Sequence, residues 1–480
     1  MQAEDLIKLI KTVQTQKCET QTIEVKAANQ GCPTKLFDTL SSFSNQDGGG
    51  IIVFGIDEKQ GFKLVGVYDA QDLQHRVAEQ CKQMQPAVRP LFTVCEIDGN
   101  FLVSAEIPSV DISERPVYYR GVGRVKGSFV RVGEADEPMS DYEIYSYDAY
   151  RRRVRDDIRI AELAEVSQFS PELIAQYIAA VKKEKPNTAK LSDEQILNLM
   201  AVVKDGKPTL AAVLCFSEFP QAAFPQLCIT AVVVPGLKMG DKGVDGERFS
   251  ANKRIEGTIG EMVDAAMLFV KRNMREKTIV EDGKRQDKTE YPVDAVREAV
   301  LNALMHRDYS IHTEGTPVRI MMFNDRMEIW NDGGLYGKLT IDGLGKVHAD
   351  TRNQVLANIL ELQKVAENRY SGIPTIRDEM ADYRLPAPIF ENKRGNFVVT
   401  LKNDFPSHAL ESTVTDAVLT RINLISFCKQ ARTRDEIAEY LGKTQYYAMR
   451  AFVDPLLASG QLKQTIPDKP KSRLQKYYSE

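Results

Sequence analysis

Residues 51–57 constrain the fold of this chain more than any other segment. Their sequence, IIVFGID, is an apolar run that ends in an acidic residue, and it follows a turn at 45–50 that contains three consecutive glycines. A short apolar run bounded by turn residues predicts a buried strand. The alternating stretch at 22–26 predicts a half-buried strand, and residues 91–97 and 101–107 predict a β-hairpin. The first part of the chain therefore predicts a compact α+β domain that ends near residue 140.

The length of 480 residues predicts about three domains. Beyond residue 140 the sequence predicts charged helices, and the apolar stretches at 209–216 and 229–234 predict strands. A long amphipathic helix is expected at 258–274, and residues 280–289, which lack apolar periodicity, are expected to form a loop. We expect an α+β multidomain protein divided into the segments 1–145, 146–289, 290–403 and 414–480.

Composition excludes several classes of protein. The chain has 63 Lys and Arg against 67 Asp and Glu, a net charge of −4, which excludes a wholly basic nucleic-acid coat protein but leaves room for a local basic patch. No apolar run approaches the about 18–20 residues needed to span a bilayer, and the start of the chain does not resemble a secretory signal. The seven cysteines are scattered without C-x-x-C spacing, so neither a zinc site nor a disulfide framework is expected. A cytoplasmic location is expected.

The first group of candidate site residues consists of Glu19, Glu24, Lys26 and Asp57. Glu24 and Lys26 are two residues apart on a predicted strand, so their side chains point to the same face. Carboxylates that converge there with Asp57 could hold a divalent metal, and Lys26 could stabilise a phosphate. Such sets of acids and a lysine are found in metal-dependent nucleases. The spacing alone favours a surface strand with a salt bridge, because Glu and Lys are common residues.

A family resemblance adds weight to this group. The segments that carry it are 19–26, 40–45, 47–57, 116–121 and 129–133. In this order they resemble the Schlafen AlbA-like domain over about residues 15–145. The resemblance implies a nucleic-acid-binding domain of the kind found in bacterial members. In animal Schlafens the domain belongs to an RNA-cleaving core, whose acidic residues match Glu19, Glu24 and Asp57 here.

The second group lies on a predicted helix that ends at His306. Glu298, Asn302 and His306 follow one another at a spacing of four residues, which places them on one helix face. A carboxylate that orients water and an amide that holds Mg²⁺ are what hydrolysis of a nucleoside triphosphate needs. The alternative is an ordinary helix with a polar stripe. After a predicted hairpin come Asp332 and Gly334, and an Asp beside glycines can accept a hydrogen bond from the amino group of adenine.

Together these residues resemble the N and G1 boxes of the GHKL ATP-binding fold, an α/β sandwich, over residues 290–402. The resemblance implies that Glu298 is catalytic, that Asn302 holds Mg²⁺, and that ATP is bound by Asn302, His306, Asp332, Gly334, Gly337 and Gly372. Residues 351–357 and 370–373 would take the places of the ribose and phosphate elements. The phosphate loop keeps only one glycine, and Tyr336 stands where a full G1 box has Gly. We therefore expect nucleotide binding rather than efficient hydrolysis.

The third group lies at the C-terminal end. Thr433 and Glu436 form a capping box that opens a short helix, and a second predicted helix follows. From 441 to 480 seven basic and three acidic residues give a charge of +4, the reverse of the whole chain. This pattern resembles a winged helix-turn-helix that binds double-stranded DNA, with a protein-contact winged helix as the alternative. The candidate DNA contacts are Lys443, Gln445, Tyr446, Arg450, Lys469, Lys471 and Arg473.

These expectations combine into one main hypothesis and one alternative. The main hypothesis is a homodimeric, ATP-responsive and DNA-binding transcriptional regulator in the cytoplasm, with ATP and Mg²⁺ as cofactors. The alternative is an enzyme, a metal-dependent Schlafen-type nuclease acting on RNA or DNA, which ATP controls and which could serve in defence. Incubation with labelled nucleic acid and a divalent cation separates the two.

Overall fold

The computed structural model describes residues 1–243, 246–281, 284–347, 350–366, 372–404, 423–441, 445–467, 472 and 475–479. These residues divide into two compact units. The first comprises Met1–Val233, Ala251–Met322 and Arg326–Asn403, and the second comprises Val234–Ser250, Phe323–Asp325 and Asp404–Glu480. Several separate sheets and many helices confirm the expectation of an α+β multidomain protein.

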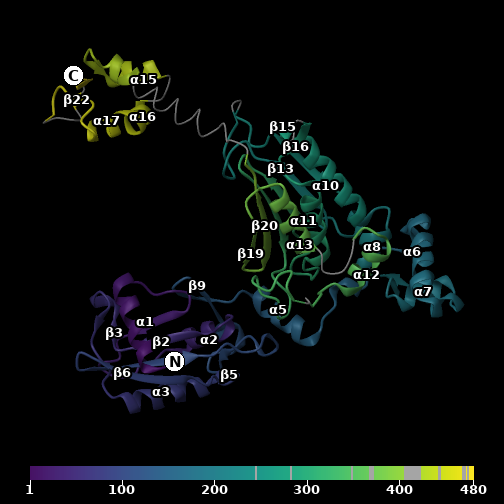
Figure 1. Ribbon diagram of the computed structural model, residues 1–480, viewed down its shortest axis with the longest axis horizontal. Coiled ribbons are helices and arrows are strands. Elements are labelled where there is room, and N and C mark those ends of the chain that lie inside the picture. Colours follow the sequence, from purple (N-terminus) through teal and green to yellow (C-terminus); the bar gives the residue numbers. More distant parts are fainter. Residues whose placement is uncertain are drawn as a thin grey trace. The chain divides into compact units, whose positions relative to one another are not determined.

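The N-terminal part of the first unit is built on a four-stranded sheet in the order β1-β2-β7-β6 (Figure 1). The strands are β1 (Ile23–Lys26), β2 (Gly50–Phe54), β7 (Asn100–Ile107) and β6 (Leu91–Ile97). Strands β1 and β2 are parallel, and the other neighbours are antiparallel, so the predicted strand and hairpin are confirmed. The β2 side chains alternate between the two faces. One face packs on α1 (Ala3–Gln16), and the other on α2 (Phe37–Asn45) and α3 (Ala70–Lys82).

The glycine turn before β2 has a steric cause. Gly49 has φ +69°, and a Cβ there would lie 2.1 Å from the backbone oxygen of Ile107. A Cβ on Gly50 would lie 2.4 Å from the ring of Phe43 on α2. The predicted single strand at 51–57 is interrupted at Gly55, where φ is +102°, and continues as β3 (Ile56–Asp57), which pairs with β4 (Lys63–Leu64).

A helical region follows the N-terminal domain. It contains α5 (Asp141–Arg152), α6 (Pro171–Glu184), α7 (Asp193–Leu199) and α8 (Leu210–Phe216). The strand predicted at 209–216 is therefore wrong. All seven residues of α8 are buried, so the sequence there shows no periodicity that separates a helix from a strand, and the side chain of Thr209 caps the helix by accepting from the Ala212 amide.

The remaining part of the first unit is a six-stranded sheet in the order β14-β13-β17-β18-β20-β19. The strands are β14 (Ala251–Ile255), β13 (Ile229–Val233), β17 (Val318–Met322), β18 (Arg326–Asp332), β20 (Asn396–Lys402) and β19 (Ile389–Lys393). Only the β13–β17 pair is parallel. Because β13 and β14 pair into this sheet, the boundary expected at residue 290 falls inside it.

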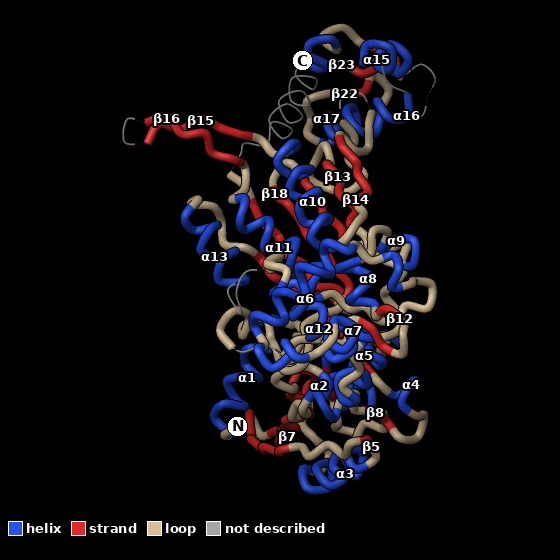
Figure 2. Tube along the Cα trace, turned by 90° about the vertical axis from the view of Figure 1, so that its right-hand side faces the viewer, coloured by secondary structure: helices blue, strands red, loops and turns tan. Residues whose placement is uncertain are grey.

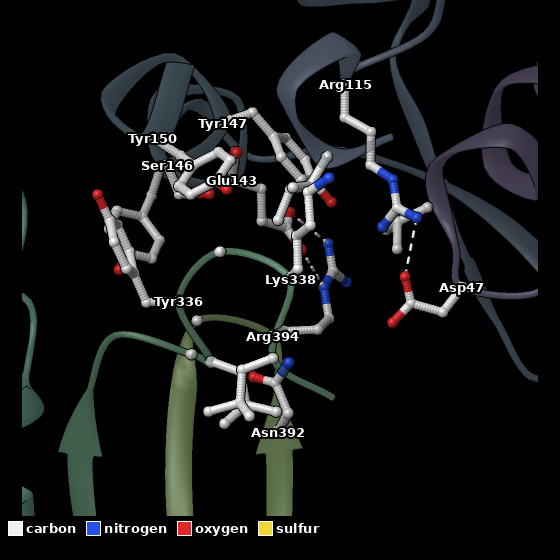
Figure 3. Close-up of a pocket in the computed structure, with 18 of the residues that line it drawn as sticks. Asp47, Arg115, Glu143, Ser146, Tyr147, Tyr150, Tyr336, Lys338, Asn392 and Arg394 are labelled. Atoms are coloured by element: carbon white, nitrogen blue, oxygen red, sulfur yellow. Dashed lines mark hydrogen bonds and ion pairs between the residues drawn. The ribbon is translucent and has the colours of Figure 1, made fainter. Parts of the chain in front are cut away.

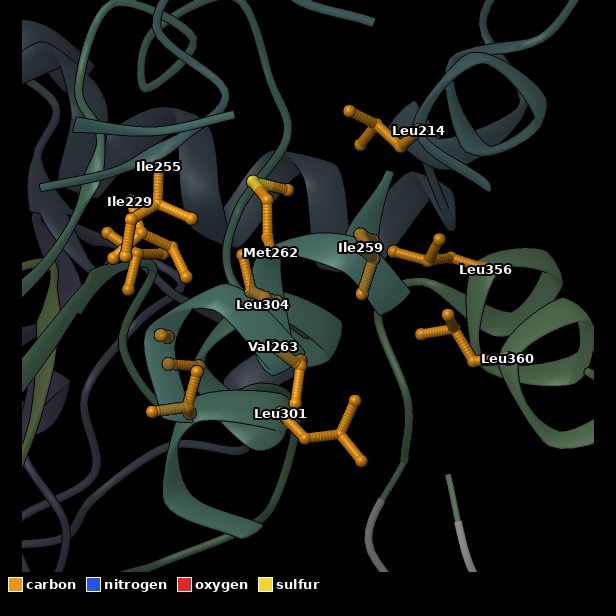
Figure 4. Packing of buried hydrophobic residues seen from close by; sticks show 14 of the residues in the cluster. Leu214, Ile229, Ile255, Ile259, Met262, Val263, Leu301, Leu304, Leu356 and Leu360 are labelled. Carbon is orange, nitrogen blue, oxygen red and sulfur yellow. The ribbon is translucent and has the colours of Figure 1, made fainter. Parts of the chain in front are cut away.

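Helices α10 (Ile259–Asn273), α11 (Val293–His306), α12 (Gln354–Leu362) and α13 (Gly372–Asp382) accompany this sheet. Their apolar faces share one core with the strands and with α8, as Figure 4 shows for Ile229, Met262, Leu304 and Leu356. Helix α11 buries its alanine, valine and leucine side chains in this core. Its polar face, with Glu298 and Asn302, is therefore available to a site.

Residues 276–289 form a hairpin of β15 (Glu276–Glu281) and β16 (Lys284–Thr289). Figure 2 shows this hairpin extending away from α10 and α11. The loop expected at 280–289 is therefore wrong. A strand pair that projects from the body of its domain does not need the apolar alternation by which a half-buried strand is recognised.

The second unit has its own small core around Leu424, Ile437, Val453 and Tyr477. Its helices include α15 (Arg434–Leu441), α16 (Gln445–Ala448) and α17 (Asp454–Ala458), with a π-helical stretch, Met449–Val453, before α17. The strands β21 (Arg432–Thr433), β23 (Lys476–Tyr478) and β22 (Lys463–Gln464) pair in that order. Thr433 and Glu436 exchange side-chain to backbone hydrogen bonds of 3.3 and 2.8 Å, which confirms the predicted capping box.

Candidate functional site

A cavity of about 580 Å³ lies beside the polar face of α11. Of the residues predicted to bind nucleotide, it brings together Glu298, Asn302, His306, Gly334 and Gly372. Further walls come from residues that the sequence had not singled out. These include Lys185, Asn331, Gly333, Leu344, Lys346, Asp350, Asn358, Glu361 and Phe397.

The centre of the cavity is the Glu298–Asn302 pair. The Asn302 amide nitrogen donates to the Glu298 carboxylate at 3.1 Å, as the spacing of four residues on one helix allows. Gly372, the first residue of α13, closes on this pair. A Cβ there would lie 2.2 Å from Glu298 Oε1 and 2.7 Å from Asn302 Nδ2. The backbone of α13 can approach both polar groups only because residue 372 has no side chain.

Asp332 does not line this cavity, whereas its neighbour Asn331 does. Side chains of β18 alternate, and Met327, Ile329 and Asn331 are on the buried face while Asp332 is half-buried on the other. Asn331 is only 4% exposed. The predicted role of Asp332 in recognising adenine therefore has no support in the geometry, and an amide occupies that position. Gly337 is likewise absent from this cavity and lines a neighbouring one.

Arg352 is a buried cation in the cavity wall. Its guanidinium contacts the Asp308 carboxylate at 2.5 Å and donates to the Gly334 carbonyl at 3.4 Å. Burial favours the neutral form of Asp308, but the cation prevails and holds the pKa of Asp308 below its usual value. Gly333 must be glycine here, because its φ is +96° and a Cβ would lie 2.6 Å from the Asp308 amide nitrogen.

His306 and Asn353 lie at the end of α11 and the start of α12, next to the cavity. Asn353, which precedes α12, donates to the carbonyls of Met305 and Arg307 at 2.9 and 2.8 Å and so ties the start of α12 to the end of α11. His306 lines the cavity as an exposed residue. The surrounding protein and then the charge of Arg352 lower the pKa of His306 to about 4, so this ring is neutral at pH 7.

In the N-terminal domain, Glu19, Glu24 and Lys26 come together around Arg131, which the sequence had not suggested. Lys26 pairs with Glu24, and Arg131 contacts Glu24 at 2.9 Å and Glu19 at 3.7 Å. The other guanidinium nitrogen of Arg131 contacts Asp136 at 3.0 Å. We call these five residues the N-terminal charge cluster.

Glu19 is the least compensated acid of the N-terminal charge cluster. Its Oε1 accepts from the Val25 amide at 2.8 Å. Burial raises the pKa of Glu19 to about 7, the amide of Val25 partly opposes this shift, and repulsion from Glu24 adds to it. At neutral pH this carboxyl is therefore partly protonated.

Asp57 is not a member of the N-terminal charge cluster. Its carboxylate caps a short 3-10 turn, accepting from the Lys59 amide at 3.0 Å and from the Gln60 side chain at 2.7 Å. Within the residues that the structure describes, no three His, Cys, Asp or Glu side chains lie together as a metal site requires. The structure thus keeps Asp57 apart from Glu19 and Glu24, and these two acids both contact the Arg131 guanidinium.

Of the predicted DNA contacts in the second unit, Gln445 and Arg450 can be placed. Gln445 donates to Asp435 at 2.7 Å, so its amide is engaged within the unit, and Arg450 is exposed. Lys443, Lys469, Lys471 and Arg473, together with the side chain of Tyr446, lie outside the described residues. Across the described chain, no helix has both the length and the apolar character to cross a membrane.

The fold and these sites define a protein with an N-terminal α+β domain and a second domain that carries a nucleotide-sized cavity. Two family models match the chain in these regions. Residues 19–140 match the family described as "Schlafen, AlbA_2", and residues 315–401 match the family described as "Putative ATP-dependent DNA helicase recG C-terminal". Residues 19–140 are therefore similar to the Schlafen AlbA-type domain and residues 315–401 to the RecG C-terminal-type region, as the sequence resemblances indicate.

Solved structures give weaker likenesses. The DIP2311 protein from Corynebacterium diphtheriae is 17% identical over 95% of this chain and 93% of its own, with a TM-score of 0.40. The N-terminal domain of a RecG-related protein from Nitrosomonas europaea is 25% identical over 28% of this chain and 92% of its own, with a TM-score of 0.24. Neither TM-score reaches 0.5, so the family models carry the assignment. No curated protein matches the chain.

Proposed function

We propose that the chain binds ATP in the α11 cavity and that nucleotide binding serves a nucleic-acid-directed function. The observation that carries this proposal is the Glu298–Asn302 pair facing Gly372 in a cavity of about 580 Å³, which suits a nucleotide in size. The RecG C-terminal-type region covers β17, β18, α12, α13, β19 and nearly all of β20 in the same sheet domain. We take the domain to be GHKL-like and to include β13, β14 and α10 in addition to residues 290–403.

The donors present suit Mg²⁺ that arrives with the nucleotide. Asn302 uses its amide nitrogen toward Glu298, which leaves its carbonyl oxygen to face a cation. Mg²⁺ prefers oxygen ligands and is commonly held by one or two protein groups together with phosphates and water. The absence of a three-residue metal group among the described residues accords with this mode. Bound Mg²⁺ would supply charge neutralisation of the phosphates.

For base recognition we propose Asn331 in place of Asp332. The Asn331 side chain lines the cavity, and its Nδ2 donates to the Asp332 carbonyl at 3.3 Å. Its Oδ1 then serves as an acceptor for the exocyclic amino group of adenine. A site that offers an acceptor there disfavours guanine, which presents a carbonyl at the same position.

We further propose that the partner is nucleic acid, with duplex DNA bound by a winged helix in the second unit of a homodimeric regulator. The Schlafen AlbA-type domain and the charge of +4 over residues 441–480 support this proposal. For the N-terminal domain we favour binding over cleavage. Arg131 already neutralises Glu24, so a divalent ion would have to displace a buried cation.

Calorimetric titration of the full chain with ATP, ADP and a non-hydrolysable analogue, with and without Mg²⁺, tests the proposal. We expect saturable binding that Mg²⁺ strengthens and that Asn302→Ala makes Mg²⁺-independent. Asn198→Ala is the control. Asn198 donates to the backbone carbonyl of Glu194, four positions earlier, at 3.0 Å, on a helix that does not line the cavity. If the wild-type protein gives no binding signal with any of the three nucleotides, the proposed nucleotide binding is refuted.

A further inference from the structure

The nucleotide cavity shares a wall with a second cavity of about 480 Å³ (Figure 3). Five residues line both cavities: Gly334, Leu335, Tyr336, Leu339 and Arg352. The other walls of the second cavity come from α5 and from the Schlafen AlbA-type domain, including Asp111, Arg115 and Arg131, and from the segments 337–338 and 392–395. A ligand in the first cavity therefore touches residues that also face the N-terminal domain.

Several contacts hold this shared wall, and the residues next to it, to the N-terminal domain and to α5. Lys338 pairs with Asp111 at 2.6 Å, and the ring of Tyr336 meets that of Tyr150 edge-on with centroids 5.3 Å apart. Arg394, next to the shared wall in the second cavity, pairs with Glu143 at 3.2 Å. Most of these contacts lie at partly exposed side chains, so each contributes little energy and the set can rearrange.

The strongest connection runs through one buried carboxylate. Asp308 is 3% exposed, and its Oδ2 both contacts Arg352 and accepts a hydrogen bond of 2.8 Å from the hydroxyl of Tyr142 on α5. Arg352 is 9% exposed, and its Nε has no hydrogen-bond partner in the described structure. A buried guanidinium with an unused donor in the wall of a cavity is a place where an anionic ligand group gains a charge-assisted hydrogen bond.

We infer that nucleotide in the α11 cavity controls the hold of α5 and the Schlafen AlbA-type domain on the shared wall through Arg352, Asp308 and Tyr142. This inference rests on the proposed nucleotide site. A phosphate group draws Arg352 toward the cavity and weakens its contact with Asp308. The buried carboxylate then depends on its remaining donors, of which Tyr142 is the one that belongs to α5. Because coupling between two equilibria is reciprocal, the Tyr142 contact in turn strengthens nucleotide binding.

The test uses the full chain and two tyrosine variants. Tyr142→Phe removes the hydroxyl that Asp308 accepts from, without touching the nucleotide cavity. Tyr177→Phe is the control. Tyr177 is buried, whereas Tyr142 is half-buried, and the Tyr177 hydroxyl has no hydrogen-bond partner in the described structure. Tyr177 lines neither cavity. We expect Tyr142→Phe to weaken binding of a non-hydrolysable ATP analogue with Mg²⁺ about 3- to 10-fold, and Tyr177→Phe to change it less than 2-fold.

Hydrogen exchange supplies the second readout. Addition of the analogue to the wild-type chain should change amide exchange in α5, and Tyr142→Phe should reduce that change. If the analogue binds but α5 exchange stays constant and Tyr142→Phe matches Tyr177→Phe, the coupling is refuted while the nucleotide site stands. If calorimetry detects no binding at all, the proposed function fails first and the coupling fails with it.

Discussion

The assignment of base recognition to Asn331 instead of Asp332 can be tested with two substitutions on neighbouring residues. Asn331→Ala removes the amide that lines the cavity, and Asp332→Ala removes a carboxylate on the opposite face of β18. If the cavity binds ATP as proposed, only the first variant loses a contact to the base. If Asp332 recognised the base instead, only Asp332→Ala would lose that contact.

The magnitude follows from the hydrogen bond at stake. Removal of one partner of a buried hydrogen bond costs about 1–3 kcal/mol, which corresponds to a loss of affinity of about 5- to 150-fold. The cost to folding should be smaller, because the hydrogen bond of the Asn331 side chain within the domain is a long one of 3.3 Å to the adjacent backbone. We expect Asn331→Ala to lower the free energy of unfolding by about 1 kcal/mol, in the usual range for a point substitution.

The assay is calorimetric titration of both variants with ATP and, separately, with inorganic triphosphate, which lacks a base. Asn331→Ala should lose ATP affinity while triphosphate binding stays within 2-fold of the wild type, and Asp332→Ala should leave both unchanged. Thermal melts of both variants confirm that the fold is intact. A loss of ATP affinity in Asp332→Ala with none in Asn331→Ala would show that the β18 register does not present Asn331 to the nucleotide.

Four further outcomes are expected. Gly372→Ala should keep the fold, since Ala is the better helix former by up to about 1 kcal/mol. In calorimetry it should weaken ATP binding at least about 10-fold, because the added Cβ displaces the side chains of Glu298 and Asn302. Glu19→Gln should stabilise the chain more at pH 8 than at pH 5, by about 1–2 kcal/mol in denaturant unfolding. The reason is that the pKa of Glu19 rises from its ordinary value of 4.5 to about 7 on folding, so ionised Glu19 destabilises the folded chain as the pH rises through this range. Equal differences at both pH values would contradict this. Arg131→Ala should lower the free energy of unfolding by about 3–5 kcal/mol, since it leaves buried carboxylates without a cation. A decrease below about 1 kcal/mol would contradict a buried ion network. Removal of residues 415–480 should abolish most duplex DNA binding. For the full chain, the logarithm of the binding constant should fall with the logarithm of the salt concentration, with a slope of about 0.9 per phosphate contact. A truncated chain that binds duplex DNA as tightly would indicate that the second unit contacts proteins.

Local sequence patterns predicted elements whose burial is one-sided or whose turn residues are distinctive. The strands at 22–26, 91–97 and 101–107 fall into this group, as do the helices at 258–274 and up to His306. The pattern failed where burial is complete, as in α8, and where a strand pair projects from its domain, as in the β15–β16 hairpin. In both situations the alternation of apolar and polar residues that marks secondary structure is absent.

The candidate sites show the same limit at longer range. Glu298 and Asn302 are four residues apart on one helix, so their meeting could be predicted from the sequence. Arg131 lies 107 residues beyond Glu24, and no local pattern connects the two. The position of Asn331 was within reach of sequence reasoning, because counting alternate residues from Met327 and Ile329 along β18 leads to Asn331 and not to Asp332.

The charges of the N-terminal cluster bear on the choice between binding and cleavage. Two cations, Arg131 and Lys26, meet three acids, Glu19, Glu24 and Asp136, within contact distance. The acids outnumber the cations by one, and burial raises the pKa of Glu19 to about 7. A divalent ion relieves repulsion between carboxylates only where no fixed cation already does so. Since Arg131 and Lys26 already contact these acids, we expect millimolar Mn²⁺ to leave the melting temperature of the wild-type chain unchanged. This balance makes the Schlafen AlbA-type domain a binding module in our proposal, with the nucleotide cavity as the place where it can be controlled.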